Sequence, residues 1–156
     1  MLTVKKETKG DTLVIHLEGT IDETPPMEQA IGTIDSKKVA FGCKEIRRLN
    51  SAGVRGWIIY FENLKKRGIQ FRFFECSPTI MEQVNLIRNF RSGAPVDSFY
   101  LPYLCTGCKA QFQQLVMTDE LIKNKLEVPT LTCPKCKSPM NFDDLPEEYF
   151  IFISLL

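Results

Sequence analysis

The stretch KVAFGCKEIRRLNSAGVRGWIIYFENLKKRGIQFRFFECSPTIMEQVNLI, residues 38–87, alternates strand-like and helical patterns and decides the fold. Apolar residues at helical spacing predict a long helix over residues 51–67. Residues 38–43 and 69–75 are short apolar runs that are typical of buried strands. A serine followed by a proline predicts another helix over residues 77–90, because both are favoured where helices begin.

The flanking segments extend this pattern to about residue 100. Residues 2–8 and 12–19 predict two strands of a hairpin, joined by a Gly-Asp turn, and residues 26–34 predict a short helix. Residues 97–104 are expected to be extended. This order predicts an α/β domain over residues 1–100, with a small mixed sheet covered by helices.

The remaining residues, 101–156, predict a second, metal-binding module. It contains two Cys-x-x-Cys pairs, Cys105–Cys108 and Cys133–Cys136, separated by 24 residues. Such pairs supply the four ligands of a tetrahedral zinc site. Because four thiolates leave no open position, we expect structural Zn²⁺ in a zinc ribbon that is disordered without the ion. A redox Cys-x-x-Cys motif and an iron–sulfur cluster are the alternatives.

Composition and charge restrict the class of protein. The chain has 156 residues, of which 44% are hydrophobic and 25% charged, with a net charge of +1. Residues 1–104 carry +3 and residues 105–156 carry −2, so neither part has the basic balance of a nucleic-acid binder. No apolar run approaches the roughly 20 residues of a membrane span, and the N-terminus lacks a signal-peptide pattern. We therefore expect a cytoplasmic protein without membrane insertion, whose cysteines stay reduced.

The first turn of the long predicted helix is the candidate binding site of the first domain. A helix N-terminus has unpaired N–H groups and partial positive charge, so it favours a phosphate on Ser51. The alternative is that Ser51 only caps the helix, a role that Asn50 can also fill. The residues expected to contact a partner around Ser51 are Asn50, Ala52, Gly53, Arg47 and Arg48.

The C-terminal tail, residues 144–156, is expected to form a helix that is apolar on nearly all sides. Such a helix must be buried. Two alternatives stay open: packing on the chain's own domains, or a homodimer or partner interface. A strand over residues 149–156 is a third interpretation, because these residues also favour strands.

The first 100 residues resemble the STAS domain, the sulfate-transporter and anti-sigma-factor-antagonist family. The resemblance rests on the element order and on residues 38–87. The family's signature loop reads Asp-Ser-Ser/Thr-Gly, and here Asn50 and Ala52 replace its aspartate and its second hydroxyl residue. The resemblance implies that Ser51 is phosphorylated by a partner kinase that doubles as an anti-sigma factor.

Two functional hypotheses follow from the resemblance. In the first, the chain is a non-enzymatic signalling module whose partner is released when Ser51 is phosphorylated. In the second, it is a constitutive adaptor, such as a transporter-associated subunit, in which Ser51 only caps the helix. A third hypothesis is an enzyme or a nucleic-acid-binding protein. The sequence disfavours it, because it contains no catalytic motif and no strongly basic segment.

Overall fold

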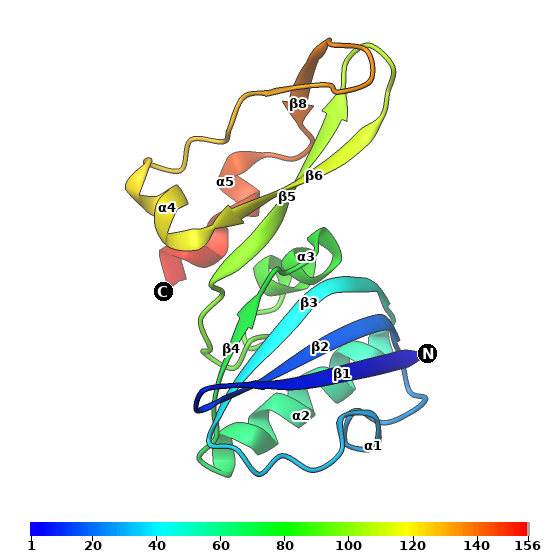
Figure 1. Ribbon diagram of the computed structural model, residues 1–156, viewed down its shortest axis with the longest axis vertical. Helices are drawn as coiled ribbons and strands as arrows, with labels where there is room; N and C mark the ends of the chain where they lie inside the picture. Colours follow the sequence, from blue (N-terminus) through cyan, green and yellow to red (C-terminus); the bar gives the residue numbers. More distant parts are fainter. Residues whose placement is uncertain (156) are drawn as a thin grey trace.

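The computed structural model describes residues 1–155 and shows a mixed α/β fold with two four-stranded sheets (Figure 1). The first sheet has the strand order β1–β2–β3–β4; β1 is antiparallel to β2, and the other neighbours are parallel. Its strands are β1 (Leu2–Lys9), β2 (Thr12–Ile21), β3 (Lys38–Leu49) and β4 (Gln70–Phe74). A mixed sheet of this kind is what the sequence predicted.

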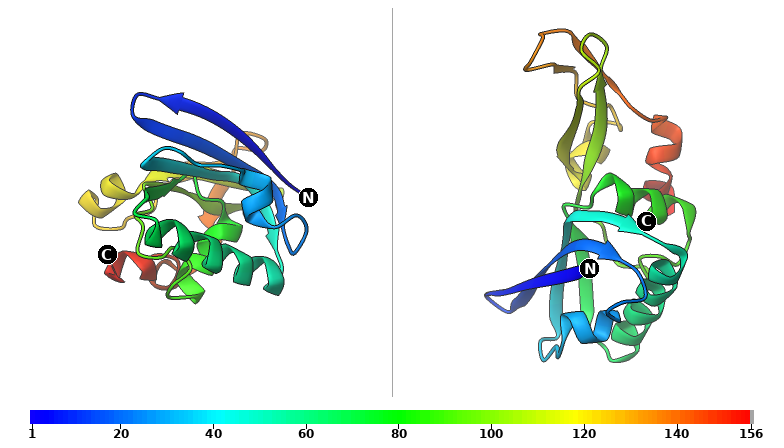
Figure 2. Two further views of the ribbon diagram at one scale, coloured as in Figure 1. Left: turned by 90° about the horizontal axis from the view of Figure 1, so that it is seen from below. Right: turned by 90° about the vertical axis from the view of Figure 1, so that its right-hand side faces the viewer.

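The second sheet is antiparallel and has the order β6–β5–β8–β7. β5 joins the two sheets. Val96, just before β5, forms an isolated parallel bridge with Phe73 of β4, and Phe99 within β5 forms another with Cys76, just after β4. The β5–β6 hairpin then extends away from the first sheet (Figure 2, right). The strands are β5 (Ser98–Cys105), β6 (Gln111–Met117), β7 (Leu131–Thr132) and β8 (Pro139–Phe142).

Six helical segments complete the described residues. The longest, α2, crosses the first sheet and ends in two lysines, which favour the negative end of the helix dipole. None of the helices in residues 1–155 combines the length and apolar character that a bilayer crossing requires. The segments are α1 (Met27–Ile31), α2 (Ser51–Lys66), α3 (Pro78–Leu86), α4 (Thr118–Lys123), α5 (Pro146–Tyr149) and a 3-10 helix (Ile151–Leu155).

Aromatic side chains form the core between α2 and the first sheet. Trp57 is fully buried, stacks on Phe90 at 4.9 Å between ring centroids, and lies 5.6 Å from Phe73. Its indole N–H donates to the carbonyl of Phe90 over 2.9 Å, so its one polar group is satisfied. Phe61 packs edge-on against Phe41 of β3 at 4.9 Å. This packing fixes α2, and with it the position of Ser51.

The tail packs on the chain itself, as one of the two alternatives for it predicted. Tyr149, Phe150 and Phe152 are buried, and all three rings lie within 6.2 Å of Phe99 in β5. Asn85 of α3 holds the tail with two hydrogen bonds. Its side-chain NH₂ donates to the Tyr149 carbonyl, and its side-chain oxygen accepts from the Phe152 N–H. The predicted single helix is present as two short pieces, α5 and the 3-10 helix, and the strand interpretation is wrong for residues 149–155.

Two boundaries and one additional helix differ clearly from the prediction. β3 continues to Leu49 rather than ending at residue 43, because Glu45–Leu49 pair with the end of β2. α3 ends at Leu86, four residues earlier than expected, because Ile87 adopts extended backbone angles. The interval between the cysteine pairs contains α4 as well as strands, and no sequence pattern predicted this helix.

Candidate functional site

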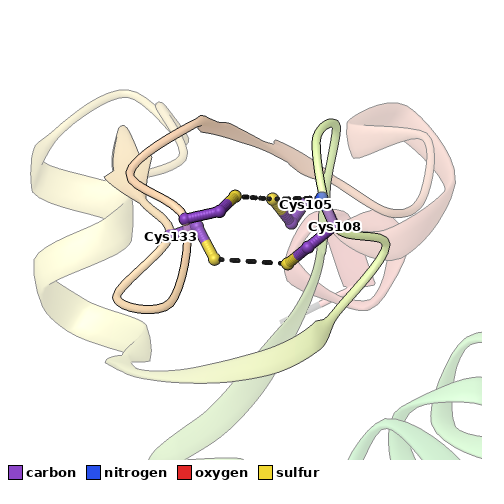
Figure 3. A group of neighbouring side chains, drawn as sticks. Cys105, Cys108 and Cys133 are labelled. Carbon is purple, nitrogen blue, oxygen red and sulfur yellow. Dashed lines mark hydrogen bonds between the residues drawn. The ribbon is translucent and has the colours of Figure 1, made fainter.

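The four cysteines of the two pairs meet at one tip of the molecule. Cys105 ends β5, Cys108 follows in the turn to β6, and the second pair lies in the turn between β7 and β8. All four sulfur atoms lie within 4.8 Å of one another. Figure 3 shows the labelled sulfurs facing one another across this cluster. The spacing in the sequence therefore predicted correctly which side chains come together.

The sulfur–sulfur distances fit a tetrahedral metal ion. Cys105 Sγ lies 3.4 Å from Cys136 Sγ, and Cys108 Sγ lies 3.7 Å from Cys133 Sγ. Four sulfurs bound at about 2.3 Å around one zinc ion would lie about 3.8 Å apart. The cluster therefore has the size that a four-thiolate site requires.

The two cysteine turns share one backbone geometry. In each, the residue after the second cysteine adopts a left-handed conformation, Lys109 with φ 62° and Lys137 with φ 64°. In the first turn, the N–H groups of Gly107 and Cys108 point at Cys105 Sγ over 3.3 and 3.4 Å. Such N–H groups stabilise a thiolate, which is the form that binds metal.

Glycine at position 107 is required by the approach of the two turns to each other. A Cβ atom there would lie 2.5 Å from Ser138 Oγ and 3.1 Å from Cys136 Sγ. Ser138 has a second effect, because its hydroxyl and then its backbone N–H lower the pKa of the Cys136 thiol to about 6. Ser138 was not predicted from the sequence, since nothing marks one serine near a cysteine pair as its neighbour.

The set of four sulfur ligands indicates a closed site. Cys105 and Cys133 are buried, whereas Cys108 and Cys136 form the exposed side of the cluster. With all four positions of a tetrahedral ion filled by sulfur, water and substrate have no place to bind. The arrangement can hold a metal ion and, through it, join β5 to the β7–β8 turn. The remaining cysteines are both buried, Cys43 in β3 and Cys76 just after β4.

The second candidate site is the N-terminus of α2, which follows directly on the carboxyl end of β3. Asn50 caps this helix, because its side-chain oxygen accepts from the Gly53 N–H over 2.7 Å. The capping role predicted as an alternative for Ser51 is therefore wrong. Ser51 is the first helical residue and is exposed, and within residues 1–155 its hydroxyl has no hydrogen-bond partner. The sequence contained two suitable caps and could not decide between them.

Gly53 is buried where α2 meets the end of β2. A Cβ atom on Gly53 would lie 2.0 Å from the carbonyl oxygen of Ile21 and 2.6 Å from its carbonyl carbon. This close approach explains the glycine. Ala52, one residue earlier, is exposed beside Ser51. The helix terminus is thus held tightly on its inner side and is open on its outer side.

Charged side chains of both signs lie on the segments next to this terminus in the sequence or in contact with its cap. The exposed Arg47 lies 3.5 Å from Glu45, and its backbone carbonyl accepts from Thr79. Arg48 is exposed near the end of β3. Glu23, which the sequence did not single out, accepts from the Asn50 side-chain amide over 3.1 Å. The structure therefore places an acidic group next to the cap, 27 residues away in the sequence.

Comparisons with known proteins give a partial likeness to solved structures. No protein-family model matches the chain, and no curated protein matches it. Among solved structures, the structure of this chain is similar to the structure of the anti-sigma factor antagonist SpoIIAA in its unphosphorylated form. The two share 17% sequence identity, and the TM-score is 0.44. The match covers 57% of this chain and 84% of the other. A likeness of this size does not assign a function to this chain.

Proposed function

We propose that this protein is a non-enzymatic regulatory module of the anti-sigma-factor-antagonist type, which binds a protein partner through the N-terminus of α2. The observation that carries the proposal is the division of roles between two neighbours. Asn50 caps the helix, and Ser51 is left exposed with a free hydroxyl. A serine without a structural task at an open helix terminus is suited to modification. The partner is a serine kinase that also acts as the anti-sigma factor.

A phosphate on Ser51 is compatible with the fold. The first N–H groups of a helix have no partner within it, and here the Gly53 N–H is already satisfied by Asn50. The N–H groups of Ser51 and Ala52 remain, and they lie at the positive end of the helix dipole. The phosphate adds about −1.5 to −2 charge at neutral pH. It therefore leaves the domain folded and disrupts a desolvated contact with a partner.

A second candidate function, a constitutive adaptor, is favoured by Glu23. Its carboxylate is bound to the Asn50 amide, so a negative charge already lies next to the cap that precedes Ser51. Like charges at close range oppose each other, so Glu23 disfavours a phosphate there. In this alternative the same surface binds its partner permanently and Ser51 is not modified.

The four-cysteine cluster has a structural role in either case. We propose that it holds Zn²⁺ and that residues 101–156 form a zinc ribbon added to a STAS-like domain over residues 1–100. Because β7 has only two residues, its pairing with β8 contributes little on its own. The metal supplies the missing stability. We further propose a cytoplasmic location, where thiols stay reduced and available to the metal.

Capture of partners from the native cell tests the proposal. Wild-type protein, a Ser51→Asp variant and a Ser154→Asp control serve as baits, and the bound proteins are quantified by mass spectrometry. Ser154 is also exposed but lies in the 3-10 helix of the tail, so it controls for an added charge. We expect the wild-type and Ser154→Asp baits to capture a kinase-type ATPase, and the Ser51→Asp bait to fail to capture it.

Two outcomes would count against the switch. Equal capture by Ser51→Asp and wild type would show that charge at this position does not affect binding. Capture of a transporter ATPase by all three baits would instead support the adaptor.

A further inference from the structure

The outer edge of β6 is an open sheet edge. β6 lies at the end of the second sheet, with β5 on one side and no strand on the other within residues 1–155. Its segment QFQQLVM has seven residues, and five of them are exposed: Gln111, Gln113, Gln114, Leu115 and Met117. An edge strand presents unpaired N–H and C=O groups to another chain.

The hydrogen bonds of β5 show which β6 groups point outward. The Pro102 carbonyl accepts from Asp143, and the Tyr100 N–H donates to Cys76, so both residues direct their backbone away from β6. Their partners on β6, Gln113 and Leu115, therefore form non-hydrogen-bonded pairs with β5. The alternation repeats along the strand. The backbone groups of Gln111, Gln113 and Leu115 point away from β5, and the Leu115 carbonyl accepts from the side chain of its neighbour Gln114 over 3.1 Å. Met117 also points outward, but it is the N-cap residue of α4, so the first turn of that helix occupies its carbonyl.

The usual features that block an edge are missing from this strand. β6 has no charged residue, no proline and no glycine. β1, the opposite example, is also an edge strand and carries Lys5, Lys6 and Lys9. The β4 edge is partly covered by the Val96 and Phe99 bridges, and β7 has only two residues. β6 is thus the one long unprotected edge in the described part of the chain.

Exposed apolar side chains lie at the same end of the hairpin. Leu115 and Met117 of β6 are 36% and 45% exposed, and Ile122 and Leu126, which follow shortly after, are 42% and 36% exposed. Leu115 and Met117 thus place exposed apolar side chains on the edge strand itself.

We propose that β6 pairs antiparallel with β6 of a second copy of this chain, which joins two second sheets into one. A second copy fits because an uncharged strand meets no like charge when it faces itself, whereas two β1 strands would bring lysines together. Gln113 and Leu115 each direct one N–H and one C=O outward, and the exposed Gln114 side chain that contacts the Leu115 carbonyl is free to rotate away for a second chain. The strand carries no charge that would select a basic or an acidic partner.

One register is centred on Gln114 and places Gln113 opposite Leu115 of the second copy. The two Leu115 side chains then occupy diagonal positions about 7–8 Å apart on one face. Because each chain has one such edge, pairing is isologous and stops at two copies. This dimer does not depend on the function proposed for Ser51.

The test measures the mass of the metal-loaded protein in solution, with two edge variants and one control. Leu115→Lys places charge on the edge, and Gln113→Pro removes an outward N–H that makes no bond to β5. Leu86→Lys is the matched control, since Leu86 is 73% exposed on α3. Sedimentation should give twice 17.9 kDa for wild type and Leu86→Lys. The edge variants should dissociate at least tenfold more readily.

Hydrogen exchange supplies a second measurement that is independent of mass. In the dimer, the Gln113 and Leu115 amides should be protected, and Leu115→Lys should remove that protection while Phe112 and Gln114, bonded to β5, stay protected. A monomeric wild type would overturn the proposal, and so would a Leu115→Lys variant that dimerises like wild type. Protection of Gln113 only when a different protein is bound would assign the edge to that protein and also overturn it.

Discussion

Substitution of Gly53 by alanine tests how α2 is seated on the sheet. A methyl group at this position would lie 2.0 Å from the Ile21 carbonyl oxygen and 2.6 Å from its carbonyl carbon. Both atoms belong to the backbone of β2, so no side chain can rotate to make room. The first turn of α2 must therefore move away from the sheet. That movement weakens the packing that positions Ser51.

The expected loss of stability is about 1–3.5 kcal/mol. Inserting a methyl group into a closely packed contact costs about 1–3 kcal/mol. Disturbing the Asn50 cap, which binds the Gly53 N–H itself, costs about 1 kcal/mol more. Alanine returns about 0.5–1 kcal/mol, because it is a better helix former than glycine.

Urea unfolding of two glycine variants measures this difference. Gly56 lies one turn further along α2, and a Cβ atom there would meet nothing within 4 Å. Gly56→Ala should therefore stabilise the protein by about 0.5–1 kcal/mol, whereas Gly53→Ala should destabilise it. Equal unfolding midpoints for the two variants would show that the Ile21 contact does not constrain the helix.

Three further substitutions or treatments have definite expected results. Asn50→Ala should lower the free energy of unfolding by about 1 kcal/mol and Ser51→Ala by less than about 0.5 kcal/mol, because only Asn50 caps α2. Thermal unfolding measures both variants, and a larger loss of stability in Ser51→Ala would contradict this assignment of the cap. Elemental analysis should find one zinc ion per chain, and Cys133→Ser should abolish binding and expose residues 105–142 to proteolysis; tight order without metal would refute the structural role. Phe152→Ala should lower the free energy of unfolding by about 3–5 kcal/mol and Ile151→Ala, at an exposed neighbour, by less than about 1 kcal/mol; similar denaturant midpoints would show that the tail is not part of the core.

Strong local patterns made part of the fold predictable. The helix predicted over residues 51–67 is α2, which spans the sixteen residues Ser51–Lys66. Its apolar positions repeat at the helical period, so its type and its approximate boundaries could be predicted directly. The cysteine spacing was equally specific, because two residues between thiols leave few alternatives to a shared ion. Ser77 and Pro78 marked the start of α3 correctly.

The differences come from contacts between segments that are distant in sequence. Residues 44–49 are largely polar and carry no strand pattern, and they become strand because β2 lies beside them. The six residues of α4 are too few to show a helical period. At the α2 terminus, Asn50 and Ser51 are both good caps, and the choice depends on the packing of Gly53 against Ile21. The contact of Glu23 with Asn50 had no sequence signal at all.

The phosphorylation state of Ser51 in the native cell tests the proposed switch most directly. The protein would be isolated under growing, starved and stressed conditions, and the peptide that contains Ser51 would be analysed by mass spectrometry. We predict that phosphate is found on Ser51 and that its share changes with the condition. A peptide that carries no phosphate on Ser51 in every condition would contradict the switch and leave the constitutive adaptor as the function of this surface.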